Sequence, residues 1–152
     1  MELNLSGKVV LITGSSKGIG KVIAEMLYAE GCKVVLNGRN KKDLESALEE
    51  MPGAISVLGD VSSPDDSRRV LSDVIQNFGK LDILVCNVGS GDSVPPGKET
   101  FDEWQRVFAQ NLWSTTNCVE ASSNALAKTQ GVIVCISSIC GIEVIPGAPV
   151  TY

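Results

Sequence analysis

Short apolar runs alternate along this chain with longer segments in which apolar residues recur every three or four positions. The runs, rich in Val, Ile and Leu, occupy residues 9–12, 33–36, 54–58, 81–86 and 132–136. Such runs are typical of strands buried on both faces, and the longer period is that of amphipathic helices. This alternation predicts an α/β fold with a doubly wound parallel sheet in the order 3-2-1-4-5. Residues 1–152 are expected to form a single domain around one core.

Polar residues mark where several of these helices begin. Ser63 followed by Pro64 is typical of a helix start, and Thr100 with Glu103 has the spacing of a capping box. The segment 41–50 is predicted to be a polar surface helix, and a long helix is expected from Thr100 onward. The first helix is expected to begin near Gly18 with one apolar face made of Ile19, Val22, Ile23, Met26 and Leu27.

The turn between the first strand and the first helix has the sequence TGSSKGIG, residues 13–20. Its glycines allow a tight turn and a close approach of the backbone to a ligand. A helix that begins here directs free N–H groups and its positive dipole end at a diphosphate. The glycine spacing differs from G-x-G-x-x-G, and a plain strand-to-helix turn is the alternative. The predicted cofactor-binding residues of this turn are Gly14, Ser16, Lys17, Gly18, Ile19 and Gly20.

The residues after the second strand indicate which dinucleotide would bind. Dinucleotide sites for NAD usually place an acidic residue here, which holds the ribose 2′-hydroxyl. This chain has Gly38, Arg39 and Asn40 instead. A guanidinium can bind a 2′-phosphate bidentately, so NADP(H) is favoured over NAD(H), and Lys17 is a second cation within reach. A solvated loop arginine is the alternative interpretation of Arg39.

Two later strands are expected to end at the same edge of the sheet. The third is followed by Asp60 and Val61, where the carboxylate could accept a hydrogen bond from an adenine amine. The fourth is followed by Asn87 and Gly89. Because the order of strands reverses between the first and fourth, the turn at Gly14 and the loop at Asn87 flank one crevice.

Composition excludes several classes of function. The net charge of −5 and a pI near 4.7 argue against nucleic acid or an anionic membrane as a partner. The chain has no His, which removes Ser-His-Asp and Cys-His catalysis and the commonest zinc ligand, and no metal site is expected. The five cysteines are expected to be mostly buried, reduced thiols of a cytoplasmic protein. No apolar run is long enough for a membrane span.

Taken together, these motifs resemble the short-chain dehydrogenase/reductase family, whose fold is a Rossmann-type sheet. TGSSKGIG is similar to its cofactor turn T-G-x-x-x-G-x-G, Asp60-Val61 to its adenine-contacting pair, and residues 86–89 to its N-N-A-G, with Cys86 and Val88 as departures. Asn111, Ser138 and Tyr152 match three members of its catalytic set. The resemblance implies an NADP(H)-dependent oxidoreductase that transfers hydride between nicotinamide and a small-molecule carbonyl or secondary alcohol.

The resemblance also implies a role for each catalytic residue. Tyr152 would exchange a proton with the substrate oxygen, Ser138 would polarise that oxygen, and Asn111 would hold a water in a proton relay. The family's active site is Y-x-x-x-K, and this sequence ends at Tyr152, before that lysine. We therefore expect a longer protein, and expect the 152 residues alone to be inactive. Without further strands, the apolar fifth strand would lie exposed at a sheet edge.

Two alternatives belong to other classes of protein. One is a cofactor-binding module without catalysis, for which the absent lysine would be the signature. The other is a nucleotide-sugar epimerase of the extended family, whose usual G-x-x-G-x-x-G turn and NAD cofactor both count against it here. The resemblance further implies a homo-dimer or homo-tetramer, with the long helix from Thr100 in a four-helix interface. It does not indicate which substrate is used.

Overall fold

The structure is a computed structural model that describes residues 3–143. Its strands are β1 (Val9–Ile12), β2 (Lys33–Gly38), β3 (Ile55–Leu58), β4 (Ile83–Cys86) and β5 (Val132–Cys135). Its helices are α1 (Gly18–Ala29), α2 (Lys41–Glu49), α3 (Pro64–Phe78), α4 (Phe101–Phe108) and α5 (Ser114–Thr129). A π-helical turn, η1 (Ala109–Trp113), joins α4 to α5, and a short 3-10 turn, η2 (Ile139–Gly141), follows β5.

All five strands are parallel and lie in the order β3-β2-β1-β4-β5, which confirms the predicted topology. β1 is central because its four residues are apolar and almost fully buried. It pairs with β2 on one side and with β4 on the other. Two strands that are consecutive along the chain, β3 and β4, therefore lie on opposite sides of β1. The chain thus builds the sheet outward from β1 in two directions, and the order of strands reverses between β1 and β4.

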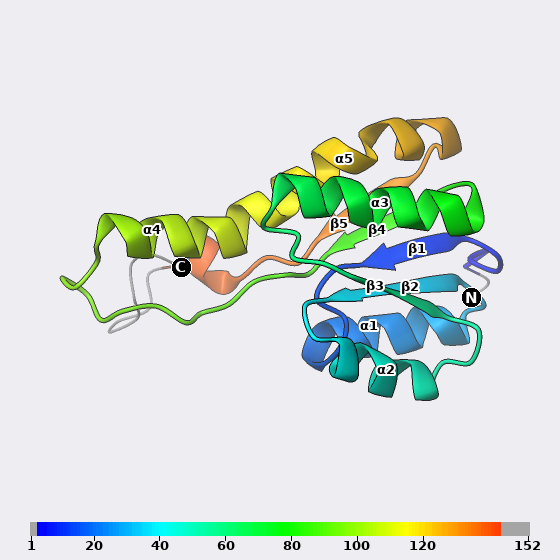
Figure 1. Cartoon of the computed structure of the whole chain (residues 1–152), viewed down its shortest axis with the longest axis horizontal. Helices are drawn as coiled ribbons and strands as arrows, with labels where there is room; N and C mark the ends of the chain where they lie inside the picture. The colour runs from blue at the N-terminus through cyan, green and yellow to red at the C-terminus, as the bar shows by residue number, and fades with distance from the viewer. Residues whose placement is uncertain (1–2, 144–152) are drawn as a thin grey trace.

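Helices cover both faces of this sheet (Figure 1). One core lies between the sheet and helices α3 and α5 and includes Leu11, Leu84 and Val74. The other lies beneath α1 and α2 and includes Ile12, Leu36 and Leu44. Helix α4 and the loop before it extend past the carboxyl ends of the strands (Figure 1). Within residues 3–143, no helix is both long enough and apolar enough to span a bilayer.

The long helix expected from Thr100 is confirmed, because α4, η1 and α5 follow one another without a break from Phe101 to Thr129, with a five-residue π-helical turn between the two α-helical parts. One sequence expectation about the helices was wrong. The first helix does not bury the predicted apolar face: Ile23 and Leu27 pack against the core, whereas Ile19, Val22 and Met26 are exposed. The side of α1 against the sheet carries Gly20 and Ala24 instead. These small residues let the helix lie close to the strands, which turns the larger side chains outward.

Strand β5 is an edge of the described sheet, and its residues Val132–Cys135 are all exposed. This confirms the expectation of an apolar strand at an edge. Cys135 is also exposed and Cys140 is half-buried, so the expected burial of the thiols holds only for Cys32, Cys86 and Cys118.

The amino ends of the neighbouring strands β1 and β4 are held together by the buried carboxylate of Asp82. Its Oδ2 accepts the Val9 amide at 2.8 Å and lies 2.7 Å from Lys80 Nζ, and its Oδ1 lies 3.4 Å from Lys8 Nζ. Burial acts to raise the pKa of Asp82, but the hydrogen bonds from Lys80 and Val9 and the charge of Lys80 outweigh it and lower that pKa.

We expect Asp82→Asn to lower the free energy of unfolding by about 1–3 kcal/mol at neutral pH, because the charge-assisted bonds are lost. A lowered folded-state pKa stabilises the fold above the unfolded carboxyl pKa of about 3.9, and that stabilisation disappears as pH falls through the folded value. Urea unfolding at several pH values should show the variant and the wild type converging in acid. The exposed Asp92→Asn is the control, and a pH-independent difference would contradict the assignment.

Candidate functional site

A cleft of about 910 Å³ opens along the carboxyl ends of the strands. Its walls come from the turn after β1, the ends of β2 and β3, the loop after β4, and the α4–η1 segment. Most of the predicted cofactor residues line this cleft. They are Gly14, Ser16, Lys17, Ile19, Arg39, Asn40, Asp60, Val61, Asn87 and Gly89. Gly18 and Gly20 belong to the same turn without lining the cleft.

The glycine turn is fixed to β2 through Ser15. The Ser15 amide donates to the Asn37 carbonyl at 2.9 Å, and the Asn37 amide donates to Ser15 Oγ at 3.0 Å. Ser15 Oγ also donates to the Ile12 carbonyl at 2.6 Å. Gly14 and Gly18 have φ values of +62° and +59°, which L side chains rarely adopt. The turn therefore needs glycine at these two positions for its backbone conformation.

Asn87 holds the other side of the turn. Its Nδ2 donates to the carbonyls of Thr13 and Gly14 at 3.0 and 3.1 Å, and its own amide donates to Thr13 Oγ1 at 3.0 Å. A Cβ at Gly20 would lie 2.5 Å from Asn87 Nδ2 and 2.5 Å from the Gly14 carbonyl oxygen. Gly20 is thus required for close packing, since its φ is not positive. Asn87 therefore holds the turn in position, and its side-chain Nδ2 is already used in doing so.

Helix α1 begins at this turn without a side-chain cap. Lys17 is its N-cap residue, makes no capping hydrogen bond, and is followed by no acidic residue in the first turn. In contrast, α2, α3 and α4 are capped by the side chains of Asn40, Ser63 and Thr100. Uncapped amides at a helix start, together with its positive dipole end, form an anion site. The first turn of α1 can therefore receive a phosphate group in the cleft.

The ends of β2 and β3 bring opposite charges to the cleft. Arg39 Nη1 lies 3.5 Å from Asp60 Oδ2, and Asp60 Oδ1 accepts from the Ser62 amide at 3.0 Å and from Ser62 Oγ at 2.7 Å. Burial acts to raise the pKa of Asp60, but the Ser62 hydrogen bonds and the charge of Arg39 outweigh it, so the pKa is lowered. Asp60 is therefore a charged acceptor at neutral pH.

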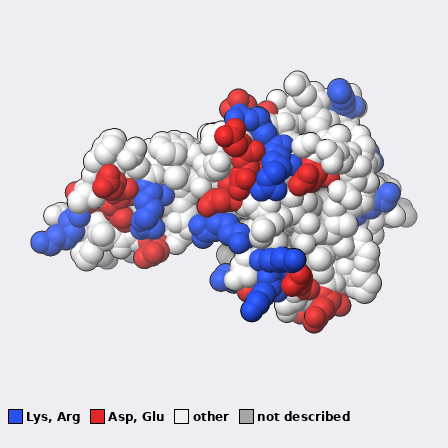
Figure 2. Space-filling view, in the orientation of Figure 1, with Lys and Arg blue, Asp and Glu red and all other residues white. Residues whose placement is uncertain are grey.

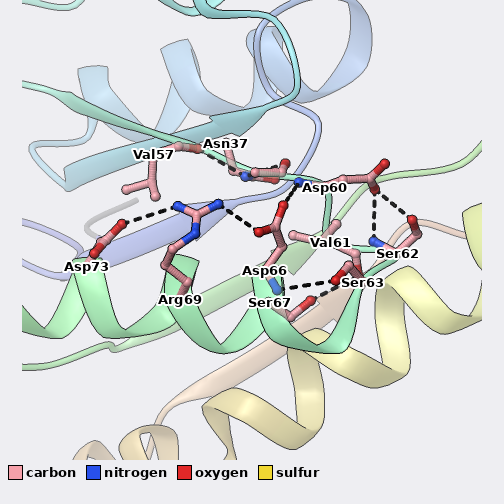
Figure 3. A network of polar contacts seen from close by, with 11 residues as sticks. Asn37, Val57, Asp60, Val61, Ser62, Ser63, Asp66, Ser67, Arg69 and Asp73 are labelled. Atoms are coloured by element: carbon pink, nitrogen blue, oxygen red, sulfur yellow. Dashed lines mark hydrogen bonds and ion pairs between the residues drawn. The ribbon is translucent and has the colours of Figure 1, made fainter.

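A polar network holds Asp60 and Val61 in place (Figure 3). The Asp60 amide donates to Asp66 Oδ2 at 2.8 Å, and Arg69 Nη2 donates to Asp66 Oδ1 at 2.9 Å. Ser67 Oγ donates to the Val61 carbonyl at 2.9 Å. Helix α3 thereby fixes the backbone that follows β3 and leaves the Asp60 side chain facing the cleft.

Asn111 lies in η1, where both ends of its side-chain amide are hydrogen-bonded to Ser90. Its Oδ1 accepts from the Ser90 amide at 2.7 Å, and its Nδ2 donates to the Ser90 carbonyl at 2.9 Å. This pair ties the π-helical turn to the loop after β4, next to Gly89. A Cβ at Gly89 would lie 3.4 Å from Asn111 Oδ1. Asn111 does not itself line the cleft, but it is bonded to Ser90 and lies next to Gly89, which both do.

The other two predicted catalytic residues are not brought into the described cleft. Ser138 follows β5 and is exposed, its Oγ accepts from the Cys140 amide at 3.2 Å, and it does not line the cleft. Tyr152 lies outside the described residues. The described residues thus bring together most of the predicted cofactor-binding residues, and of the predicted catalytic residues only Asn111 lies beside the cleft.

The structure adds lining residues that the sequence interpretation missed. They are Asp43, Ser62, Ser90, Arg106 and Gln110, among others. Ser62 could have been inferred because it follows Asp60-Val61 directly. Arg106 and Gln110 could not, since no motif surrounds them and they reach the cleft only because α4 runs into η1. On the face of the molecule seen in Figure 2, basic and acidic side chains are interspersed. Any electrostatic attraction for an anion is therefore local to the cleft.

Comparison with known proteins decides the family. The short chain dehydrogenase family model matches residues 8–150, nearly the whole chain. This chain belongs to the short-chain dehydrogenase family. An 11-beta-hydroxysteroid dehydrogenase 1A of Arabidopsis thaliana is 38% identical over 141 residues, which are 89% of this chain and 40% of that protein. The chain spans about half the length of its curated relatives, from 40% to 62%.

Solved short-chain dehydrogenases have the same fold. A short-chain type dehydrogenase/reductase from Mycobacterium marinum superposes with a TM-score of 0.89 at 29% identity, over 95% of this chain and 61% of that one. A Burkholderia phymatum member of the family, determined in complex with NAD, has a TM-score of 0.91 at 24% identity, over 98% of this chain and 55% of that one. The described sheet and its flanking helices are thus those of the family.

We expect Gly20→Ala to destabilise this short-chain dehydrogenase by about 1–3 kcal/mol, because the new methyl group displaces Asn87 or the turn. Gly53→Ala is the matched control. Its φ is +91° with nothing within 4 Å of an added Cβ, so it tests backbone strain alone, about 1 kcal/mol. Urea denaturation measures both. A Gly20→Ala variant that is no less stable than Gly53→Ala would contradict the close packing described here.

Proposed function

We propose that the protein is an NADP(H)-dependent oxidoreductase that transfers hydride between nicotinamide and a carbonyl or secondary alcohol substrate. The observation that carries this proposal is the cleft in which the uncapped start of α1 and the Arg39 guanidinium lie together. A diphosphate fits the amides at the start of α1. A 2′-phosphate fits the guanidinium. NADP(H) carries both groups.

The packing around Gly38 supports NADP(H) over NAD(H). Gly38 is the last residue of β2, the position at which NAD sites usually carry the carboxylate that binds the ribose hydroxyl. A Cβ there would lie 3.3 Å from Ser16 Oγ and 3.5 Å from Leu44 Cδ2. A side chain at this position would need the Ser16 side chain to give way by a few tenths of an ångström. This close contact favours glycine over an acidic residue at position 38.

The ion pair between Arg39 and Asp60 does not prevent phosphate binding. The two side chains are 69% and 42% exposed, and an exposed pair at 3.5 Å contributes little free energy. Asp60 also keeps both Ser62 hydrogen bonds when Arg39 leaves. Arg39 can therefore turn to a phosphate while Asp60 stays in place as an acceptor for the adenine amine.

The proposed reaction assigns one role to each catalytic residue of the intact protein. When bound, the nicotinamide supplies or accepts the hydride. Tyr152 gives a proton to the substrate oxygen or takes it back, and Ser138 donates a hydrogen bond to the same oxygen. Because the Asn111 side chain is engaged with Ser90, its contribution to a proton relay would come through its main chain. We place the protein in the cytoplasm, consistent with its free thiols.

We also propose that two copies of the chain associate through α4 and η1. An aromatic and aliphatic stripe lies exposed along this arm at residues Phe101, Trp104, Phe108 and Leu112. Trp104 and Phe108 contact each other, with ring centroids 5.8 Å apart. Val107 is the only buried residue of α4. A stripe of this kind is covered efficiently by its own symmetry mate in a twofold dimer.

Arg39→Asp should shift the cofactor preference toward NAD(H). We expect the ratio of the NADPH and NADH dissociation constants in the intact protein to change at least roughly tenfold toward NADH, since a charge-assisted bond contributes about 1.5–3 kcal/mol. Nucleotide fluorescence titration measures both constants. Arg68→Asp, on the exposed side of α3, is the control for added negative charge. Unchanged discrimination in Arg39→Asp would remove Arg39 from the 2′-phosphate site.

Replacing Phe101 and Phe108 together by Glu should halve the mass of the particle in solution, because the charged stripe cannot be buried against its copy. Size-exclusion chromatography with light scattering gives that mass. Val22→Glu with Met26→Glu is the matched control, since it charges an exposed apolar stripe on α1 instead. A wild-type protein that is monomeric, or a stripe variant with unchanged mass, would contradict the proposed interface.

A further inference from the structure

The start of helix α3 departs from the usual arrangement at a helix N-terminus. Ser63 is its N-cap residue, and the side chain of the third helical residue, Asp66, would ordinarily accept the N-cap amide in a capping box. Here the Ser63 amide donates to the Asp60 carbonyl at 2.9 Å. The Asp66 carboxylate reaches further back, and its Oδ2 accepts the Asp60 amide at 2.8 Å. A charged group of α3 therefore binds the backbone of the residue that is proposed to contact adenine.

Arg69 holds the Asp66 carboxylate in this orientation (Figure 3). Its Nη2 donates to Asp66 Oδ1 at 2.9 Å, and its Nη1 lies 3.7 Å from Asp73 Oδ2, one turn further along α3. The hydrogen bond from the Asp60 amide, followed by the one from Arg69, lowers the pKa of Asp66. Asp66 is therefore charged at neutral pH, and each of its carboxylate oxygens has a partner.

The backbone just before Asp60 is packed closely between α3 and β2. A Cβ at Gly59 would lie 2.8 Å from Val70 Cγ2 and 3.0 Å from Arg69 Nη2, so α3 leaves no room for a side chain here. From the other side, Asn37 Nδ2 donates to the Gly59 carbonyl at 3.2 Å. The chain therefore enters the cleft from a fixed point, and the bond from its next amide to α3 sets the direction in which it continues.

The neighbouring ion pair on α3 shows that helix geometry alone does not produce this contact. Asp65 Oδ1 lies 2.6 Å from Arg68 Nη2, which is the same three-residue spacing as Asp66 and Arg69. The Asp65 side chain is 92% exposed, compared with 36% for Asp66. The two carboxylates therefore differ in the bond that Asp66 makes to the Asp60 amide.

Given the proposed function, on which this inference rests, we propose that Asp66 is a positioning residue of the adenine site. By holding the Asp60 amide, it orients the Asp60 carboxylate toward the 6-amino group of adenine. Asp60 Oδ1 accepts from the amide and the hydroxyl of Ser62, whereas Oδ2 lies 3.5 Å from the exposed Arg39 and is available to a donor. Asp66 does not line the cleft, so it acts through Asp60 and not by contact with the nucleotide.

The experiment compares NADPH with deamino-NADPH, in which hypoxanthine replaces adenine and the 6-amino group is absent. The intact wild-type protein should bind NADPH roughly tenfold more tightly, because deamino-NADPH loses a hydrogen bond to a charged acceptor. Asp66→Ala should lower this ratio of dissociation constants toward one, mainly by weakening NADPH. A merely structural role would weaken both nucleotides equally and leave the ratio unchanged. Nucleotide fluorescence titration measures all four constants.

Asp65→Ala is the matched control, since it removes the neighbouring paired carboxylate and should keep the wild-type ratio. Asp60→Ala should lower the ratio as far as Asp66→Ala does, and the double variant should lower it no further, because both residues act through one hydrogen bond. If Asp66→Ala does not fold, Asp66→Ser measures the same loss, since its hydroxyl is one bond shorter than the carboxylate.

A wild-type protein that binds the two nucleotides equally, or an Asp66→Ala variant that keeps the wild-type ratio, overturns the assignment while the proposed function stands. Binding of neither nucleotide by the wild type means that the proposed function itself fails. Hydrogen exchange of the Asp60 amide then still tests the bond to Asp66. That amide should exchange faster in Asp66→Ala than in Asp65→Ala, and equal exchange in the two variants contradicts the bond.

Discussion

The site depends on the hydrogen bonds by which Asn87, at the end of β4, holds the glycine turn at the end of β1. These two strands are neighbours only because the sheet reverses its winding between them. Asn87 Nδ2 donates to two carbonyls of a turn that Ser15 also ties to β2, and Gly20 lets the first helix approach within contact distance of Asn87 and the Gly14 carbonyl. The uncapped start of α1 then lies beside the cleft that Gly14, Lys17 and Ile19 line. Binding capacity there is thus a consequence of topology and packing together.

At the ends of β2 and β3, separate contacts likewise fix the backbone and the side chain of Asp60. Helix α3 holds the Asp60 backbone through Asp66, and Ser62 holds the Asp60 carboxylate. Arg39 has a single exposed ionic partner among the described residues, so its position can change at little cost. An acceptor held by Ser62 beside an exposed cation suits the proposed nucleotide, whose adenine and 2′-phosphate must be bound together. The net negative charge of the chain does not oppose this, because basic groups stand within the cleft itself.

Much of the fold could be predicted because its signals are local. Apolar runs and glycine spacing identified the strands and the turn, and the crossover rule then fixed their order. The same local signals misplaced the buried face of α1, because Gly20 and Ala24, not the larger Ile19 and Met26, are the residues that fit against the sheet. The π-helical turn at Asn111 could not be predicted, since no sequence pattern marks it and the side-chain partner of Asn111 is Ser90, 21 positions earlier in the chain. Arg106 reaches the cleft because α4 runs into this turn.

The central claim is that main-chain amides at the start of α1 hold a nicotinamide dinucleotide phosphate. Calorimetric titration of the intact protein with NADPH tests it most directly, with 2′,5′-ADP as a second titrant that lacks the diphosphate bridge and the nicotinamide. We predict saturable binding of one NADPH per chain, and weaker binding of 2′,5′-ADP. The absence of any binding heat with NADPH, confirmed by an unchanged melting temperature at saturating nucleotide, would contradict it.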